Sequence, residues 1–258
     1  MEYCDFHTHL DWYEDSLELE NQLSGFKGTI IAASVDEKSF KKNLALAEKI
    51  HSQFSGCCII PTFGIHPEKV PFVEESLSFY DEFCNQSPII GEIGMDFCWY
   101  KEASPKKQEE VLRYFLHHCN NTKKFCVIHT KNAEQKILEL LDDYPDVKPI
   151  IHWYDGPESV FEKLVERNCY FTFGCETIRS VKIQEFLKTI PQNLILAETD
   201  NPTAEPWLGG KDNSVFLIKR IYSDIAEILG LSENKTAEII NENSRRIVSA
   251  AFNTVKIL

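Results

Sequence analysis

The chain has 258 residues, 43% of them hydrophobic and 26% charged, which is enough for one sizeable core. Its net charge of −13 argues against a surface that coats nucleic acid nonspecifically, because such surfaces displace counterions and are usually basic. An enzyme that takes one strand end into a pocket is still compatible with this charge, since bound metal ions can supply positive charge locally.

Two further features bear on where the protein works. No run reaches about 18 apolar residues, and the first residues, MEYCDFHTHLD, lack the basic and apolar regions of a signal peptide, so we expect no membrane association. The nine cysteines are an odd number and include no CxxC pair. Most stand in apolar runs, where a free cysteine behaves as a small hydrophobic residue. We therefore expect a cytoplasmic protein with reduced thiols.

Eight short runs rich in β-branched or aromatic residues predict β-strands. Between successive runs there is room for a helix, as a βα unit requires. The predicted strands are Glu2–His7, Thr29–Ser34, Cys57–Phe63, Pro88–Ile93, Phe125–His129, Pro149–His152, Cys169–Phe173 and Asn193–Glu198.

Segments of helical periodicity lie between most of these runs and after the last one. Asp36 and Ser104 are predicted N-caps, and Pro105 suits the first position of a helix. The predicted helices are Asp36–Ser55, Glu74–Cys84, Pro105 through Leu116, Ala133–Tyr144, Pro157 through Val165, Arg179–Thr189, Val215–Leu229 and Glu233–Phe252.

Eight strands alternating with helices predict an α/β fold with a parallel sheet, and eight is the number that closes a (β/α)8 TIM barrel. No linker or low-complexity segment divides the chain, so we expect one barrel domain over residues 1–258. A doubly wound open sheet is the alternative fold. It usually carries a Gly-rich phosphate turn after its first strand, and residues 5–10, DFHTHL, do not form one.

Histidines and carboxylates stand at the ends of several predicted strands. Because the active site of such a barrel lies at the carboxyl ends of its strands, these side chains should converge there. His7 and His9 are two residues apart and would face the same side of a strand. Imidazole and carboxylate groups together suit Zn²⁺ or Mn²⁺, or Mg²⁺ where carboxylates dominate. The residues in question are His7, His9, His66, Glu92, His129, His152 and Asp200.

On these residues the sequence resembles the TatD family of metal-dependent deoxyribonucleases, within the amidohydrolase-like barrels. The resemblance covers nearly the whole chain, and six motifs carry it in order. They are DFHTH at 5–9, GIHP at 64–67, GEIGMDF at 91–97, HTKNA at 129–133, HWYDG at 152–156 and ETDNP at 198–202.

The resemblance implies two divalent metal ions, Mg, Mn or Zn, and assigns a role to each ligand. His7, His9, Glu92 and Asp200 would bind one ion. Glu92 would bridge to a second ion held also by His129 and His152. Asp200 and Glu92 would thus be the catalytic residues, with Asp200 placed to orient or deprotonate the attacking water.

We expect five residues to bind substrate. His66 could contact phosphate or a metal-bound water, with a structural role behind the ligands as the alternative. Lys131 and Asn132 precede a helix whose N-terminus would attract an anion. Trp153 and Tyr154 could stack a nucleobase, although packing between barrel and helix is the alternative for both.

Lys131 and the motif at 152–156 depart from the family pattern. Lys131 replaces the usual arginine, which exchanges a bidentate phosphate clamp for a point charge. Residues 152–156, HWYDG, replace the usual His-Cys-Phe-Ser-Gly, and Asp155 is expected to add negative charge near the phosphate. An HW-aromatic motif in so compact a chain resembles the TatD-type nucleases of Qat antiphage operons.

The leading hypothesis is a metal-dependent DNase that acts as a 3′–5′ exonuclease on single-stranded DNA ends, in antiphage defence. One alternative is an amidohydrolase or deaminase acting on a small cyclic substrate, because such barrels share the HxH pair and the final aspartate. Another is a subunit of a defence complex whose protein partners matter more than its turnover.

Overall fold

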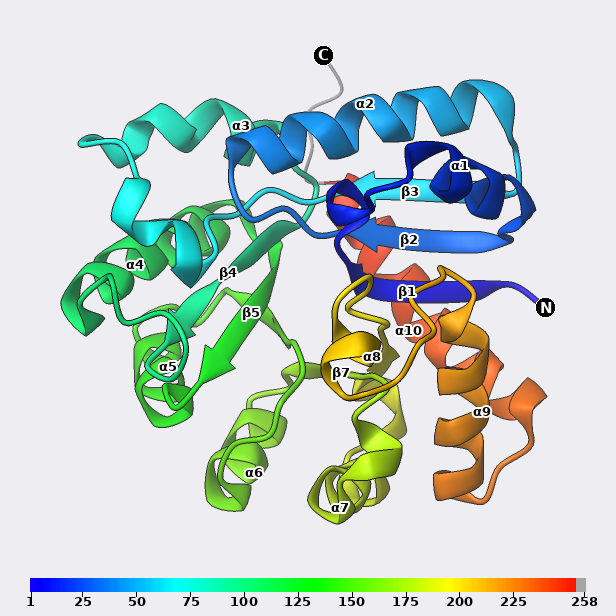
Figure 1. The fold of residues 1–258 in the computed structure, drawn as a ribbon. Helices are drawn as coiled ribbons and strands as arrows, with labels where there is room; N and C mark the ends of the chain where they lie inside the picture. The colour runs from blue at the N-terminus through cyan, green and yellow to red at the C-terminus, as the bar shows by residue number, and fades with distance from the viewer. Residues whose placement is uncertain (254–258) are drawn as a thin grey trace.

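The protein is described here by a computed structural model of residues 1–253 (Figure 1). All eight predicted strands form, with ends that differ by a few residues from those predicted. They are β1 (Tyr3–Thr8), β2 (Gly28–Ala32), β3 (Cys57–Pro61), β4 (Ile90–Asp96), β5 (Phe125–Lys131), β6 (Lys148–Ile151), β7 (Tyr170–Phe173) and β8 (Ile195–Ala197).

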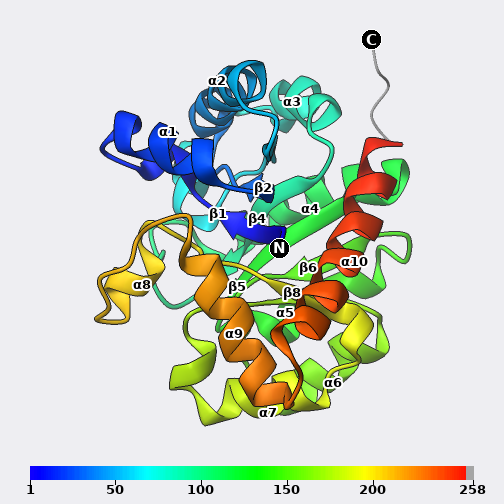
Figure 2. The same ribbon diagram turned by 90° about the vertical axis from the view of Figure 1, so that its right-hand side faces the viewer.

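Helices follow or connect the strands and cover the outside of the sheet (Figures 1 and 2). The predicted N-caps Asp36 and Ser104 each accept hydrogen bonds from the first turn of their helix. The α-helices are α1 (Ser16–Gly25), α2 (Glu37–Gln53), α3 (Asp81–Gln86), α4 (Pro105–Thr122), α5 (Glu134–Asp142), α6 (Glu158–Glu166), α7 (Val181–Thr189), α8 (Ala204–Trp207), α9 (Leu217–Leu229) and α10 (Glu233–Phe252).

The strands form a closed parallel barrel in chain order. One ladder runs β1-β2-β3 and another runs from β4 through β8. The Gly91 amide donates to Phe63 O at 2.7 Å and joins the ladders on one side. On the other side the Asp200 amide donates to His7 O at 2.9 Å, and the His9 amide donates to Asn201 O at 2.8 Å. These contacts confirm the predicted (β/α)8 barrel and exclude the alternative of a doubly wound open sheet.

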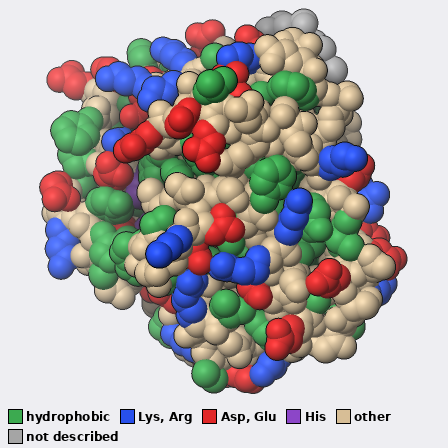
Figure 3. Space-filling model, turned by 45° about the vertical axis from the view of Figure 1, so that its right-hand side comes forward, with side chains coloured by type: hydrophobic (Ala, Val, Ile, Leu, Met, Phe, Trp, Pro, Cys, Tyr) green, Lys and Arg blue, Asp and Glu red, His purple; other side chains and the backbone are tan. Residues whose placement is uncertain are grey.

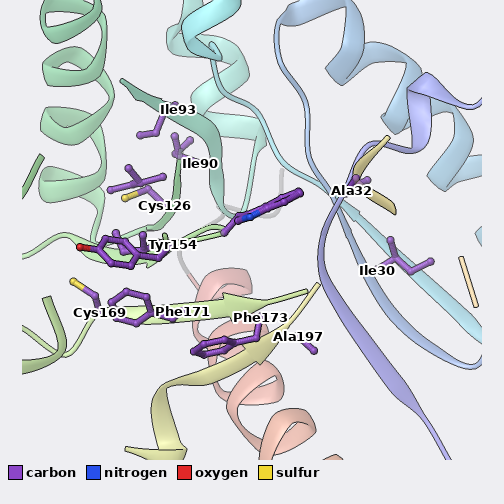
Figure 4. Close-up of a cluster of buried hydrophobic side chains, with 14 of the residues drawn as sticks. Ile30, Ala32, Ile90, Ile93, Cys126, Tyr154, Cys169, Phe171, Phe173 and Ala197 are labelled. Carbon is purple, nitrogen blue, oxygen red and sulfur yellow. The ribbon is translucent and has the colours of Figure 1, made fainter. Parts of the chain in front are cut away.

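Alternate strand residues build two apolar layers, as the period of two requires. Phe6, Val127 and Leu196 belong to a cluster that α10 completes through Ile247. The other face of the strands packs under the helices; Figure 4 shows part of this larger cluster, including Ile30 and Phe171. The side chains that continue the first series past Val127 and Ile150 are His129 and His152, which reach the carboxyl end of the barrel.

Three helical segments differ from the predictions. The helix expected over Glu74–Cys84 is a 3-10 turn at Leu77–Tyr80 followed by the short α3. Helix α1 was not predicted, although Asp15 caps it by accepting from two amides. Helix α8 was also not predicted. The assignment of residues 1–258 to one domain stays a prediction. No helix within residues 1–253 is long and apolar enough to cross a membrane.

Candidate metal centre

Two strand irregularities position the central side chains. In β1 the register gains one residue between Asp5 and Thr8, and in β4 it gains one between Ile90 and Ile93. A bulge of this kind redirects the side chains beside it. Gly91, with φ of +152°, lies so close to β5 that a Cβ there would sit 2.8 Å from the Cβ of Val127. The bulges therefore help to turn His7, His9 and Glu92 towards the carboxyl end of the barrel.

The fourth strand extends further than its sequence predicted. Glu92 was expected at the strand end, but β4 continues to Asp96, and β5 continues past His129 to Lys131. Glu92 is 2% exposed and lies inside the barrel rim. Its carboxylate is the central group of the site, because each of its oxygens faces a different set of side chains.

The first set lies around Glu92 Oε2. That oxygen is 3.4 Å from His7 Nε2 and 3.5 Å from His9 Nε2. Asp200 Oδ1 completes the set, at 3.6 Å and 3.3 Å from the same two nitrogens. His7, His9 and Asp200 have ligand atoms within 4.8 Å of one another, a spacing that could hold a cation.

The second set lies around Glu92 Oε1. His129 Nδ1 is 3.0 Å away, His66 Nε2 is 3.6 Å away and His152 Nε2 is 3.7 Å away. Glu92 groups with His66 and His129, and also with His7 and His152, as a possible cation site. His66 therefore stands among the potential ligands, whereas its sequence context suggested a contact with phosphate or a metal-bound water.

His129 and His152 each contact a further carboxylate through the ring nitrogen that does not face Glu92. Asp96 Oδ2 is 3.0 Å from His129 Nε2, and Glu198 Oε2 is 2.8 Å from His152 Nδ1. Such a partner fixes the orientation of a ligand histidine and raises its basicity. Asp5 supports the β8 side by accepting from the amide and hydroxyl of Thr199. Asp96 was missed from sequence, although it lies in the motif at 91–97.

The electrostatics follow from burial and these contacts. Burial would raise the pKa of Glu92, but the surrounding imidazoles outweigh it and hold that pKa well below its usual range. Burial lowers the pKa of His152 and lowers that of His66 to about 3. For His129 burial acts downwards too, yet hydrogen bonds with Asp96 and Glu92 raise its pKa to about 9. Glu92 is thus a carboxylate, the form that binds metal.

The site passes two tests of fit to a divalent cation. Both ring nitrogens of His7 are buried and lack a hydrogen-bond partner among the described residues, which is costly for polar atoms unless another group satisfies them. The donors are imidazole and carboxylate groups, which suit Zn²⁺, Mn²⁺ and similar ions.

A cavity of about 310 Å³ opens above these groups. Figure 3 shows histidine atoms deep in a hollow whose rim includes hydrophobic side chains. Its lining is His9, Trp12, His66, Glu92, Trp99, Tyr100, His129, Lys131, His152, Trp153, Asp200, Thr203, Ala204 and Trp207. Trp12, Trp99 and Tyr100 had not been singled out from sequence.

Three of the five predicted substrate contacts line this cavity, namely His66, Lys131 and Trp153. Lys131 Nζ is buried and donates to Trp153 O at 2.9 Å and to Asp155 Oδ1 at 3.1 Å. The negative charge that Asp155 was expected to add near the phosphate is therefore paired with Lys131.

The other two lie elsewhere. Tyr154 is 4% exposed, its hydroxyl donates to Pro157 O, and its ring packs against Phe161, Phe171 and Phe186. Figure 4 shows the Tyr154 ring within this buried cluster. Asn132 is exposed and outside the cavity lining, and its amide donates to Glu134. The structure therefore places Tyr154 between barrel and helix, which was the alternative predicted for it.

Known proteins resemble this chain over nearly its full length. The hydrolase YabD of Bacillus subtilis (strain 168), named an uncharacterized metal-dependent hydrolase, is 27% identical over 256 residues, which cover 94% of this chain and 97% of that protein. Deoxyribonuclease TATDN3 of Homo sapiens is 22% identical over 261 residues, covering 94% and 93%. The crystal structure of a hydrolase TatD family protein from Entamoeba histolytica has a TM-score of 0.80 at 16% identity and covers 96% and 98%.

The family model described as TatD related DNase matches residues 4–249. The matched segment contains every residue of the candidate metal centre and all eight strands, apart from Tyr3 at the start of β1. The chain therefore belongs to the TatD family of metal-dependent hydrolases, some of whose members are named deoxyribonucleases.

Proposed function

We propose that this chain is a metal-dependent nuclease that hydrolyses phosphodiester bonds from the 3′ end of single-stranded DNA. The observation that supports this most directly is that the two carboxylate oxygens of Glu92 face different sets of side chains. One of its oxygens faces His7, His9 and Asp200, and the other faces His129, His152 and His66. A carboxylate shared in this way suits two neighbouring ions, the arrangement used in many phosphoryl-transfer sites.

In this proposal His7, His9, Glu92 and Asp200 hold one divalent ion, and Glu92, His129 and His152 hold the other. The ions are Mg, Mn or Zn. When bound, they would activate a water molecule and stabilise the charge that develops on the phosphoryl group. His66 lies near enough to the second set to contact either an ion or the phosphate.

Asp200 is the group we assign to proton transfer. Its side chain is 16% exposed, against 2% for Glu92, so it faces the cavity more openly than the other carboxylate of the site. From this position it can accept the proton of the attacking water or orient that water. Glu92 is the second catalytic residue, because its carboxylate fixes the spacing of the two ligand sets.

Lys131 and Trp153 would receive the substrate. Lys131 is the one lysine or arginine among the described residues that line the cavity, so it supplies the fixed positive charge for a phosphate. Its present partner Asp155 is half exposed and could give way to that phosphate. The overall charge of −13 then favours capture of one strand end over broad binding to duplex DNA.

The proposal is tested with end-labelled oligonucleotides, metal removal and one variant. We expect Mn²⁺ or Mg²⁺ to support stepwise shortening of a 5′-labelled single strand, and EDTA to abolish it. The Glu92→Ala protein should be inactive under all metal conditions. EDTA-resistant cleavage, or cleavage by Glu92→Ala at the wild-type rate, would reject the proposal. Parallel assays of nucleoside deamination and cyclic amide hydrolysis test the amidohydrolase alternative directly.

We also propose a role in antiphage defence, together with protein partners encoded nearby. This rests on the resemblance of residues 152–156, HWYDG, to the nucleases of Qat operons. Phage plating on cells that carry this gene together with its neighbouring genes, with wild-type or Glu92→Ala protein, tests it. Equal protection by the two proteins would assign the effect to a partner role without turnover, and no protection by either would reject it.

A further inference from the structure

Tryptophan is unusually distributed in this chain. All four tryptophans, Trp12, Trp99, Trp153 and Trp207, line the one cavity above Glu92. Trp12 stacks on His9 with ring centroids 3.9 Å apart, and Trp153 is 8% exposed, so these two pack against the site. The other two face outward, with Trp99 47% exposed and Trp207 65% exposed. Large exposed aromatic surface beside a catalytic cavity points to a ligand.

Trp99 and Trp207 form a pair from opposite parts of the chain. Trp99 follows β4 and Trp207 ends α8, yet their ring centroids are 5.7 Å apart with an interplanar angle of 67°. Trp153 lies 5.9 Å from Trp207 and continues the wall towards His152. The pair is thus the outer end of a continuous aromatic surface that leads to the candidate metal centre.

Polar anchors outside the cavity hold both members of the pair. Asp96 Oδ1 accepts from the Trp99 amide at 2.6 Å, so the same carboxyl group that contacts His129 also fixes the Trp99 turn. Glu205, 2% exposed, ties α8 down by accepting from Arg179 at 2.7 Å and from Arg220 at 3.0 Å. The rings are therefore presented on a fixed backbone, which lowers the entropy lost when a ligand binds.

The charges around the pair define the ligand. Lys131 Nζ lies 5.6 Å from the Trp99 ring centroid and 5.4 Å from that of Trp153. The Trp99 ring is 6.3 Å from the ring of His129, a proposed metal ligand. A ligand that satisfies all three features has a flat π-system joined to an anion that reaches both Lys131 and the metal centre. A nucleotide has this chemistry.

We propose that Trp99 and Trp207 form a stacking site for the nucleobase beside the scissile phosphate. The inference rests on the proposed nuclease function and adds to it the element that selects the substrate. Within a duplex both faces of a base are covered by its neighbours, and at a blunt end one face is still covered, so the site favours frayed or single-stranded ends over blunt duplex ends. Every base has a π-face, so the site discriminates weakly among the four bases.

The experiment compares two substrates across matched variants. The substrates are a 5′-labelled single strand and the same strand with abasic sites at its last two 3′ positions. The variants are Trp99→Ala, Trp207→Ala and Trp207→Phe, with Phe72→Ala as control, because Phe72 is 80% exposed and lies outside the cavity lining. Thermal melting of each variant checks that it is folded.

We expect kcat/KM on the normal strand to fall roughly 5- to 150-fold in Trp99→Ala and Trp207→Ala, largely through KM. Trp207→Phe should recover most of the loss, and Phe72→Ala should match the wild type. The wild type should cut the abasic strand about as slowly as Trp207→Ala cuts the normal strand, and Trp207→Ala should not distinguish the two.

Two results would overturn the inference while leaving the nuclease function intact. One is unchanged kinetics in both alanine variants, which would assign the exposed pair to a protein contact. The other is an equal loss on normal and abasic strands, which would mean that the rings act on the metal centre and not on a base. If the wild type shows no EDTA-sensitive cleavage, the proposed function fails; quenching of wild-type tryptophan fluorescence by an oligonucleotide, or its absence, then decides the stacking site alone.

Discussion

Asp96 joins two parts of the site through a single carboxyl group. One of its oxygens contacts His129 and the other accepts from the amides of Cys98 and Trp99. Its contact with His129 Nε2 leaves Nδ1 of that ring facing Glu92. Asp96 thus orients the His129 ring towards Glu92, although Asp96 itself does not contact Glu92.

Replacing Asp96 should therefore weaken metal binding. We expect Asp96→Asn to lower affinity for Mn²⁺ roughly 10- to 100-fold, because partners of this kind orient the ligand and raise its basicity. Titration calorimetry on the EDTA-treated protein measures it, with Glu166→Gln, an exposed surface change, as the control. Wild-type affinity in Asp96→Asn would show that His129 needs no such partner.

Sequence reasoning could place the histidines but not the carboxylate that supports His129. His129 and His152 were predicted because each ends an apolar run at the expected edge of the barrel. Asp96 was missed because its run appeared to end at Glu92, and only the continuation of β4 brings Asp96 beside His129. Trp99 and Trp207 were missed as a pair because Trp99 follows β4 and Trp207 ends α8, far apart in sequence.

Among the elements, the loop between β6 and α6 sends its two aromatic side chains, Trp153 and Tyr154, in different directions. Trp153, with φ of +41°, faces the cavity, and Tyr154 enters the apolar layer under the helices. The hydroxyl of Tyr154 donates to Pro157 O, directly before α6 begins. Tyr154 thus connects the start of α6 to the barrel, through this hydrogen bond and through its packing on Phe171 of β7.

Removing that hydroxyl should affect stability and leave catalysis unchanged. We expect Tyr154→Phe to reduce the free energy of unfolding by about 1 kcal/mol, the typical net contribution of one intramolecular hydrogen bond. Its kcat and KM on single-stranded DNA should equal those of the wild type. Urea unfolding and a cleavage assay on the same sample give both values. A changed KM with unchanged stability would return Tyr154 to the substrate site.

Element positions were more predictable than local geometry. The eight strands and the caps Asp36 and Ser104 followed from apolar runs and capping residues. The bulges at Asp5–Thr8 and Ile90–Ile93 could not be predicted, because one extra residue in an apolar run leaves no mark on its composition. Yet these bulges help to decide which way His7 and Glu92 point.

Considered as a whole, the molecule buries an acid near Glu198, which contacts the proposed metal ligand His152. Glu176, in the loop after β7, is 5% exposed and has one carboxyl oxygen without a hydrogen-bond partner among the described residues. Burial, reinforced by the nearby charge of Glu198, raises the pKa of Glu176 to about 8. The folded protein therefore keeps this proton at pH values where the unfolded chain has released it.

Glu176 should consequently make the metal-free protein lose stability as pH rises from about 5 to 8. In that range this carboxyl group binds more protons in the folded state than in the unfolded state, so its contribution to the free energy of unfolding falls with pH. Glu176→Gln, which stays neutral, should show a shallower fall. Urea unfolding of both EDTA-treated proteins at several pH values measures the difference. Parallel pH profiles would mean that Glu176 is ionised in the folded state.

If Glu92 joins two metal ions in a nuclease, replacing its carboxylate must change the metal content and the cleavage activity together. Metal content per chain is determined by mass spectrometry for the wild type and Glu92→Gln, and each sample is assayed on single-stranded DNA. We predict two divalent ions per wild-type chain. Glu92→Gln should lose at least one ion, and its cleavage should fall to the level seen with EDTA. Two ions and wild-type cleavage in Glu92→Gln would contradict the account.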